Sequence, residues 1–303
     1  MGSTSPLQSQ ETSRRTVLLI EPSPEPNRHL AELFDQSVWA VSYAHDNERA
    51  VEMAKTETFD LILTSAATTC TEDIVTLRRL RMVRPHTRVI ILTKQRLPGD
   101  ILKAIQNHAF SYFSMPIEIG DLQDLIEQVL RRPAWDDGIE LIQGDLGYVV
   151  LAARCDLGTL DRLVHFMRES VPLPDVECEE VAFAFREIML NATEHGGKLD
   201  PSKFVEICYL RAKRMVMCRV KDPGEGFSLK EIRDAEIAEP LVKHAQQGQA
   251  GEPMEIPPRG LGILMARKFV DELIFSEKGN EAFLIKYLPK QNETSSGRSL
   301  ASD

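Results

Sequence analysis

The chain has 303 residues, of which 43% are hydrophobic and 27% are charged, values typical of a globular protein with two domains of ordinary size. Its 36 basic and 46 acidic residues give a net charge of −10, which argues against nucleic acid as the main partner. No apolar run approaches the ~20 residues that a membrane-spanning helix needs, so we expect no association with a membrane. The five cysteines form no Cys-x-x-Cys pair and the N-terminal segment has no signal-peptide core, which together predict buried free thiols in the cytoplasm.

The N-terminal half alternates short apolar runs with helical patterns. Residues 1–14 are rich in Ser, Thr and Gln and are expected to be a disordered tail. The expected strands are 17–20, 38–43, 59–64, 88–93 and 111–113, and the clearest helices are 28–36 and 120–131. Alternation of this kind predicts a parallel sheet with helices on both faces.

Three segments of this half resemble the third, fourth and fifth strands of a response-regulator receiver domain: FDLIL, RVIILT and SYFSMPIE. The resemblance covers residues 15–132 and implies a flavodoxin-like, doubly wound α/β fold. It also implies an acidic site that holds Mg²⁺ and accepts phosphate on an aspartate, as well as a cis peptide bond between Met115 and Pro116.

The site residues that the family requires are largely replaced here. Ser65 stands at the phosphoacceptor position, Met115 replaces the lysine, and Pro22 follows Glu21 where a second acid is expected. Thr93 keeps the switch position of the fourth strand. Because a magnesium site needs carboxylate ligands, we predict a pseudo-receiver that is not phosphorylated by the usual route and serves as an interaction module.

Residues 133–138 read as a linker, and a second domain is expected over residues 139–289, followed by a disordered tail at 290–303. Its expected strands are 147–153, 204–210, 215–220, 272–276 and 282–288, and its expected helices are 157–170, 178–195 and 261–270. This pattern predicts a two-layer α/β sandwich with helices on one mixed sheet. The long polar interval 228–258 is interpreted as a lid.

The helix 178–195 carries a polar pair beside its apolar stripe. Glu187 and Asn191 are four residues apart, so their side chains are neighbours on one face. By itself this pair is typical of a helix with a polar flank. A buried carboxylate and carboxamide become favourable when a metal ion, a water molecule or a phosphate lies between them.

Two further motifs follow EIMLNATEH in a fixed order, namely DPGEGF after a strand and RGLGI before a helix. The set resembles the nucleotide-binding boxes of the GHKL-type ATPases, the superfamily of gyrase and the sensor histidine kinases. The resemblance implies that the chain binds ATP with Mg²⁺, that Asn191 is the metal ligand, and that Glu187 is the general base. It assigns the nucleotide to Asn191, Asp222, Gly224, Gly226, Arg259, Gly260, Leu261 and Gly262.

Within that superfamily, the compact second domain looks most like the anti-sigma-factor serine kinases, although Glu281 and Ala282 stand where the last strand often has Thr or Ser. This resemblance implies a serine/threonine kinase that phosphorylates a small, STAS-like antagonist protein in a partner-switching pathway, with a sigma factor as a further partner. A non-catalytic, ATP-gated sequestering module and a histidine-kinase-like enzyme remain alternatives. No dimerising hairpin fits between residues 133 and 175, which counts against the latter. The sequence does not decide whether the chain forms a homodimer.

Overall fold

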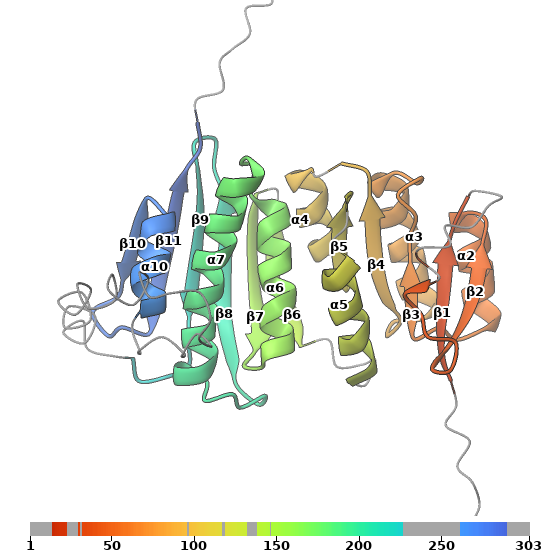
Figure 1. The fold of residues 1–303 in the computed structure, drawn as a ribbon, viewed down its shortest axis with the longest axis horizontal. Helices are drawn as coiled ribbons and strands as arrows, with labels where there is room; N and C mark the ends of the chain where they lie inside the picture. The colour runs from red at the N-terminus through yellow and green to blue at the C-terminus, as the bar shows by residue number, and fades with distance from the viewer. Residues whose placement is uncertain are drawn as a thin grey trace, which may run out of the picture. The chain divides into compact units, whose positions relative to one another are not determined.

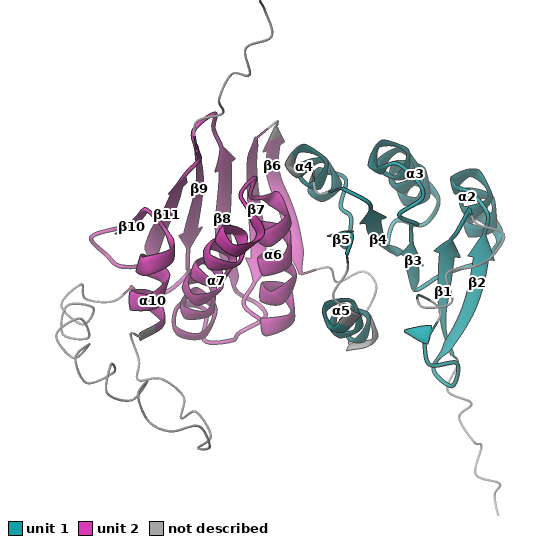
Figure 2. Ribbon diagram, turned by 45° about the horizontal axis from the view of Figure 1, so that its top comes forward, with its two compact units in different colours: residues 1–137 teal, residues 138–303 magenta. Residues whose placement is uncertain are grey.

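The computed structural model describes residues 14–22, 30, 32–95, 97–116, 119–131, 138–145, 147–226 and 261–289. Two compact units divide the chain after Asp137 (Figure 2). Of the expected helix at 28–36, residues 28, 29 and 31 lie outside the described residues, and residues 33–36 are turn or irregular backbone, so a helix of that length is not confirmed. The expected lid at 228–258 and the tail at 290–303 lie outside the described residues, as does the tail at 1–14 except for Arg14. No described helix is long and apolar enough to cross a membrane.

The first unit is a five-stranded parallel sheet with the strand order β2-β1-β3-β4-β5 (Figure 1). Its strands are β1 (Arg15–Ile20), β2 (Trp39–Ala44), β3 (Leu61–Leu63), β4 (Arg88–Thr93) and β5 (Ser111–Ser114). Its helices are α2 (Asn47–Thr56), α3 (Cys70–Val83), α4 (Pro98–Gln106) and α5 (Ile119–Arg131). The alternation of strands and helices expected from the sequence is therefore confirmed.

Both faces of this sheet are covered, which explains why β1, β3 and β4 carry continuous apolar runs. Alternate strand residues such as Leu61, Leu63 and Ile90 pack with Leu122 and Leu125 of α5 in one core cluster. Figure 2 shows α2, α3 and α4 on the opposite face from α5. The expected doubly wound arrangement is present.

The second unit is a six-stranded sheet with the order β10-β11-β9-β8-β7-β6, and every described pairing in it is antiparallel. Its strands are β6 (Ile139–Asp145), β7 (Tyr148–Arg154), β8 (Phe204–Arg211), β9 (Met215–Lys221), β10 (Glu272–Phe275) and β11 (Glu281–Tyr287). The expectation of a mixed sheet is therefore wrong for the described strands. The sequence did not predict the edge strand β6, because its alternation of apolar and polar residues is short and most of its described side chains are exposed.

Three described helices form the second layer: α6 (Leu157–Ser170), α7 (Asp175–Asn191) and α10 (Leu261–Phe269). Figure 1 shows them on one face of the sheet. The predicted apolar stripe of the helix 178–195 is confirmed, because Val181, Phe185 and Ile188 of α7 and the following Ala192 are all buried. After Asn191 the helix widens into the five-residue π-helix η1 (Ala192–Gly196), a departure that the periodicity did not indicate.

Candidate functional site

Asp222 directly follows β9, which is an inner strand of the second sheet. Its carboxylate is half-buried, and Oδ1 accepts a hydrogen bond of 2.8 Å from the backbone N–H of Gly224. Burial raises the pKa of Asp222, while the Gly224 N–H and the nearby Lys278 ammonium act in the opposite direction. One carboxylate oxygen is thus fixed by the loop that follows it.

Gly196, the last residue of the π-helix, lies against this carboxylate. A Cβ atom on Gly196 would lie 2.2 Å from Asp222 Oδ1, so only glycine permits this approach. A Cβ atom on Gly224 would lie 2.8 Å from the Gly196 Cα atom, which shows how closely the two backbone segments pass. The sequence interpretation did not select Gly196, although the pair Gly196-Gly197 directly after EIMLNATEH was a signal for it.

Glu187 projects from α7 toward the first turn of α10. A Cβ atom on Gly262 would lie 2.1 Å from Glu187 Oε2, so the carboxylate rests against the backbone of that turn. Burial raises the pKa of Glu187, with Arg186 (3.7 Å between Nη1 and Oε1) opposing the effect and Glu194 adding to it. The structure therefore brings Glu187 and Gly262, which are far apart in the sequence, into contact.

The remaining predicted residues of the second unit fall into two groups. Asn191 is half-buried at the last position of α7, and Gly226 adopts a φ of 86° at the far end of the Asp222 loop. Arg259 and Gly260 lie outside the described residues, and Leu261 is described only by its backbone, as the first residue of α10. The structure thus places Glu187, Asn191, Asp222, Gly224 and Gly262 around the C-terminal end of α7, whereas Gly226 lies against the turn that joins β10 to β11.

The first unit has a polar cluster at the position of the receiver site, where Glu21 is retained but the second acid and the phosphoacceptor aspartate are replaced by Pro22 and Ser65. The Ser65 hydroxyl is buried and donates to Glu21 Oε1 at 3.4 Å, and Thr93 is buried at the end of β4. Met115, which is 46% exposed, stands where the family has its lysine and carries no charge. The peptide bond between Met115 and Pro116 is cis, as the resemblance implied.

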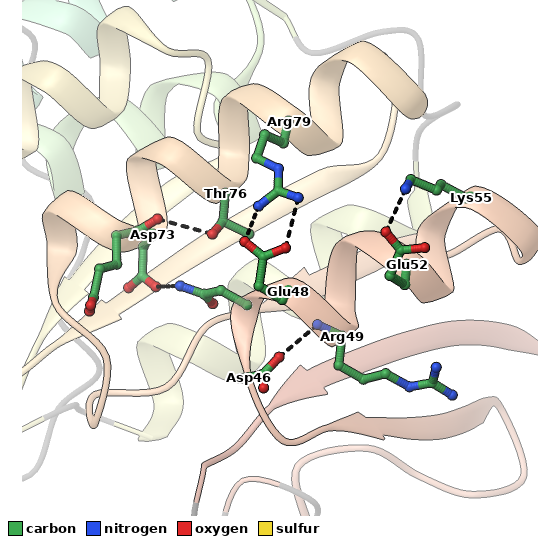
Figure 3. Close-up of polar contacts among 10 residues, drawn as sticks. Asp46, Glu48, Arg49, Glu52, Lys55, Asp73, Thr76 and Arg79 are labelled. Atoms are coloured by element: carbon green, nitrogen blue, oxygen red, sulfur yellow. Dashed lines mark hydrogen bonds and ion pairs between the residues drawn. The ribbon is translucent and has the colours of Figure 1, made fainter.

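Sequence reasoning missed a buried carboxylate next to this cluster. Asp73, in the first part of α3, is fully buried and accepts hydrogen bonds from Thr68 Oγ1 (3.0 Å) and Asn47 Nδ2 (3.2 Å). Burial raises the pKa of Asp73 to about 6, and these donors only partly offset that effect. Figure 3 shows Asp73 where α2 and α3 meet, and the Glu48–Arg79 ion pair joins the same two helices.

Two family models match the chain in succession. Residues 17–127 match the response regulator receiver domain, and residues 153–286 match the histidine kinase-like ATPase domain. The first range spans the parallel sheet except for the first two residues of β1, and the second spans the antiparallel sheet from β8 into β11, whereas β6 and most of β7 precede it.

Two curated proteins are each similar to one part of the chain. The transcriptional regulatory protein CpxR of Escherichia coli K12 is 29% identical over 121 residues, which are 40% of this chain and 51% of that protein. The anti-sigma F factor of Geobacillus kaustophilus is 27% identical over 128 residues, which are 41% of this chain and 79% of that protein. A solved CheY-like receiver domain from Methanospirillum hungatei is 18% identical, with a TM-score of 0.36, and covers 39% of this chain and 95% of that structure. The chain spans about half the length of CpxR.

Proposed function

We propose that this chain, which joins a response-regulator receiver domain to a histidine kinase-like ATPase domain, is an ATP-dependent protein serine/threonine kinase of the anti-sigma-factor type. One observation supports this proposal above the others. Three motifs that are separated in the sequence meet around the end of α7, where Glu187 contacts Gly262 and Gly196 contacts Asp222. The similarity to an anti-sigma F factor favours this branch of the ATPases.

The residues of the site fit a magnesium nucleotide. The free oxygen of Asp222 can accept a hydrogen bond from the amino group of adenine, and the first turn of α10 offers free N–H groups to phosphate. Among the described residues, no three His, Cys, Asp or Glu side chains gather as a metal site. This suits an ion that is bound mainly by the phosphates and water, with Asn191 as its protein ligand. ATP, when bound, supplies the phosphoryl group.

Glu187 is assigned the role of general base toward a serine or threonine hydroxyl. Its carboxylate is held at the first turn of α10, where the phosphates are expected, and it is ionised above its pKa. Because burial raises that pKa, the carboxylate is a stronger base than an exposed glutamate. A module that only sequesters a partner would not need this group, so Glu187 favours a kinase over that alternative.

The first domain is proposed to regulate the second without phosphorylation of its own. Ser65 provides neither the charge nor the acyl-phosphate chemistry of an aspartate, and Met115 provides no cation. We assign the small antagonist protein as substrate and a sigma factor as a further partner, in the cytoplasm. A histidine-kinase-like activity is disfavoured because β6, β7 and α6 occupy the segment where a phosphoacceptor hairpin would stand.

The test begins with a calorimetric titration of Mg·ATP into the full chain. We expect saturable binding that requires Mg²⁺ and is lost in Asn191→Ala, with Asn107→Ala in the first unit as the matched control. The chain is then incubated with radiolabelled ATP and candidate antagonist proteins, and acid treatment of the product separates phosphoserine from phosphohistidine. Absence of binding by the folded wild type would refute the nucleotide site. Binding without transfer to any antagonist would favour the sequestering module.

A further inference from the structure

The turn that joins β10 to β11 lies along the outside of the Asp222 loop. Glu281 of β11 is paired with Lys221 of β9, so Asn280 comes next to Asp222 when the antiparallel register is continued. The backbone N–H of Asp222 accordingly donates to the Asn280 carbonyl at 3.0 Å. This contact extends the sheet by one residue beyond the last strand pair and brings the turn to the proposed nucleotide site.

Asn280 also reaches the same residue with its side chain. Its Nδ2 atom donates to the Asp222 carbonyl oxygen at 3.4 Å, so both backbone groups of Asp222 are bonded to Asn280. Two residues further along the loop, the Gly224 carbonyl accepts a hydrogen bond of 3.4 Å from Lys278 Nζ. The backbone that carries the Asp222 carboxylate is therefore held from outside by two side chains of one turn.

Gly226 makes the third contact between the Asp222 loop and the β10–β11 turn. A Cβ atom on Gly226 would lie 1.8 Å from the Lys278 carbonyl oxygen, and the φ of 86° is one that other residues rarely adopt. The turn thus meets the loop at residues 222, 224 and 226, which are alternate positions. On the inner side, Gly196 and the Gly224 N–H fix Oδ1 of Asp222. The π-helix thus contacts the carboxylate of Asp222, and the β10–β11 turn holds the backbone of the loop that carries it.

We propose that Asn280 is a positioning residue for Asp222, and that it sets the preference of the site for a 6-aminopurine nucleotide over a 6-oxopurine nucleotide. This inference rests on the proposed nucleotide site and names the group that controls its selectivity. A carboxylate accepts a hydrogen bond from the amino group of adenine and repels the carbonyl oxygen at the same place in guanine. That discrimination depends on the direction of the carboxylate, and the direction depends on the backbone that Asn280 holds.

The experiment compares the dissociation constants of Mg·ATP and Mg·GTP for the full-length wild type, Asn280→Ala and Asn280→Asp. The wild type should prefer ATP. Asn280→Ala should weaken ATP binding by about fivefold while GTP binding changes little, because one hydrogen bond that holds Asp222 is lost. Asn280→Asp should lower the ATP preference further, since it replaces the donor with a carboxylate that faces the Asp222 carbonyl. Thermal unfolding and Asn107→Ala serve as controls for general destabilisation.

The ratio of the two affinities distinguishes positioning from a merely structural role. Equal loss of ATP and GTP binding in both variants, or an unchanged ratio, would overturn the inference while leaving the nucleotide site intact. Equal affinity of the wild type for ATP and GTP would also overturn it. Binding of neither nucleotide by the wild type would refute the proposed function itself, and this inference with it.

Discussion

The ionisation of Asp73 should make the stability of the first unit depend on pH. Its carboxyl is fully buried, and its pKa is raised from 3.8 to about 6. The side chains of Thr68, Asn47 and Thr64 donate hydrogen bonds to it and lower its pKa, whereas the charge of Glu72 raises the pKa slightly further. No cation is among the causes of this shift, so ionisation of Asp73 is less favourable in the folded state than in the unfolded chain.

The size and sign of the effect follow from linkage. A folded-state pKa above the unfolded value means that the contribution of the protonated acid is fully present below pH 3.8 and is lost as the pH rises through about 6. Between pH 4 and pH 7.5 the loss amounts to about 2.5 kcal/mol, at about 1.4 kcal/mol per pKa unit. Above pH 7.5 the contribution of Asp73 no longer changes.

Urea denaturation between pH 4 and pH 8 would measure this contribution, with Trp39 fluorescence as the probe. Trp39 is buried in the first unit, and a Trp135→Phe background removes the second tryptophan. We expect the stability difference between the parent and Asp73→Asn to change by about 2.5 kcal/mol across this range. Asp124→Asn, on the exposed side of α5, should follow the parent at every pH. Parallel pH profiles for the parent and Asp73→Asn would refute the reasoning.

Three further predictions concern the two sites. Glu187→Gln should retain Mg·ATP binding by calorimetry and reduce phosphoryl transfer by about 10²- to 10⁴-fold. With the wild type, transfer should decline as the pH falls through the raised pKa of Glu187, and full activity of the variant would remove this residue as the base. Gly226→Ala should lower stability by about 1–3 kcal/mol and weaken Mg·ATP binding, because of its φ of 86° and its contact with Lys278; Gly99→Ala, where a Cβ atom has nothing within 4 Å, is the matched control. Radiolabelled acetyl phosphate should not label the first domain, and a labelled Ser65 or Glu21 would contradict the pseudo-receiver assignment.

Local patterns in the sequence were sufficient for much of the fold. The apolar run of β4 and the stripe through Val181 and Phe185 identify their elements, because strand and helix periodicities are properties of neighbouring residues. The glycine motifs likewise marked the turn at Gly226, where φ is positive. The same patterns did not exclude parallel pairs in the second sheet, since pairing direction depends on segments that are distant in the chain.

The contacts that define the candidate site were decided only by the tertiary structure. Glu187 meets Gly262, and Asp222 is enclosed by Gly196 and Asn280, through pairings of β9 with β11 and packing of α7 with α10. No spacing in the sequence encodes such approaches between remote segments. Asp73 shows the same division, because its burial depends on where α2 and the end of β3 pack against α3. The sequence by itself determined which chemical groups are available, and the packing of distant segments determined which of them meet and which are removed from water.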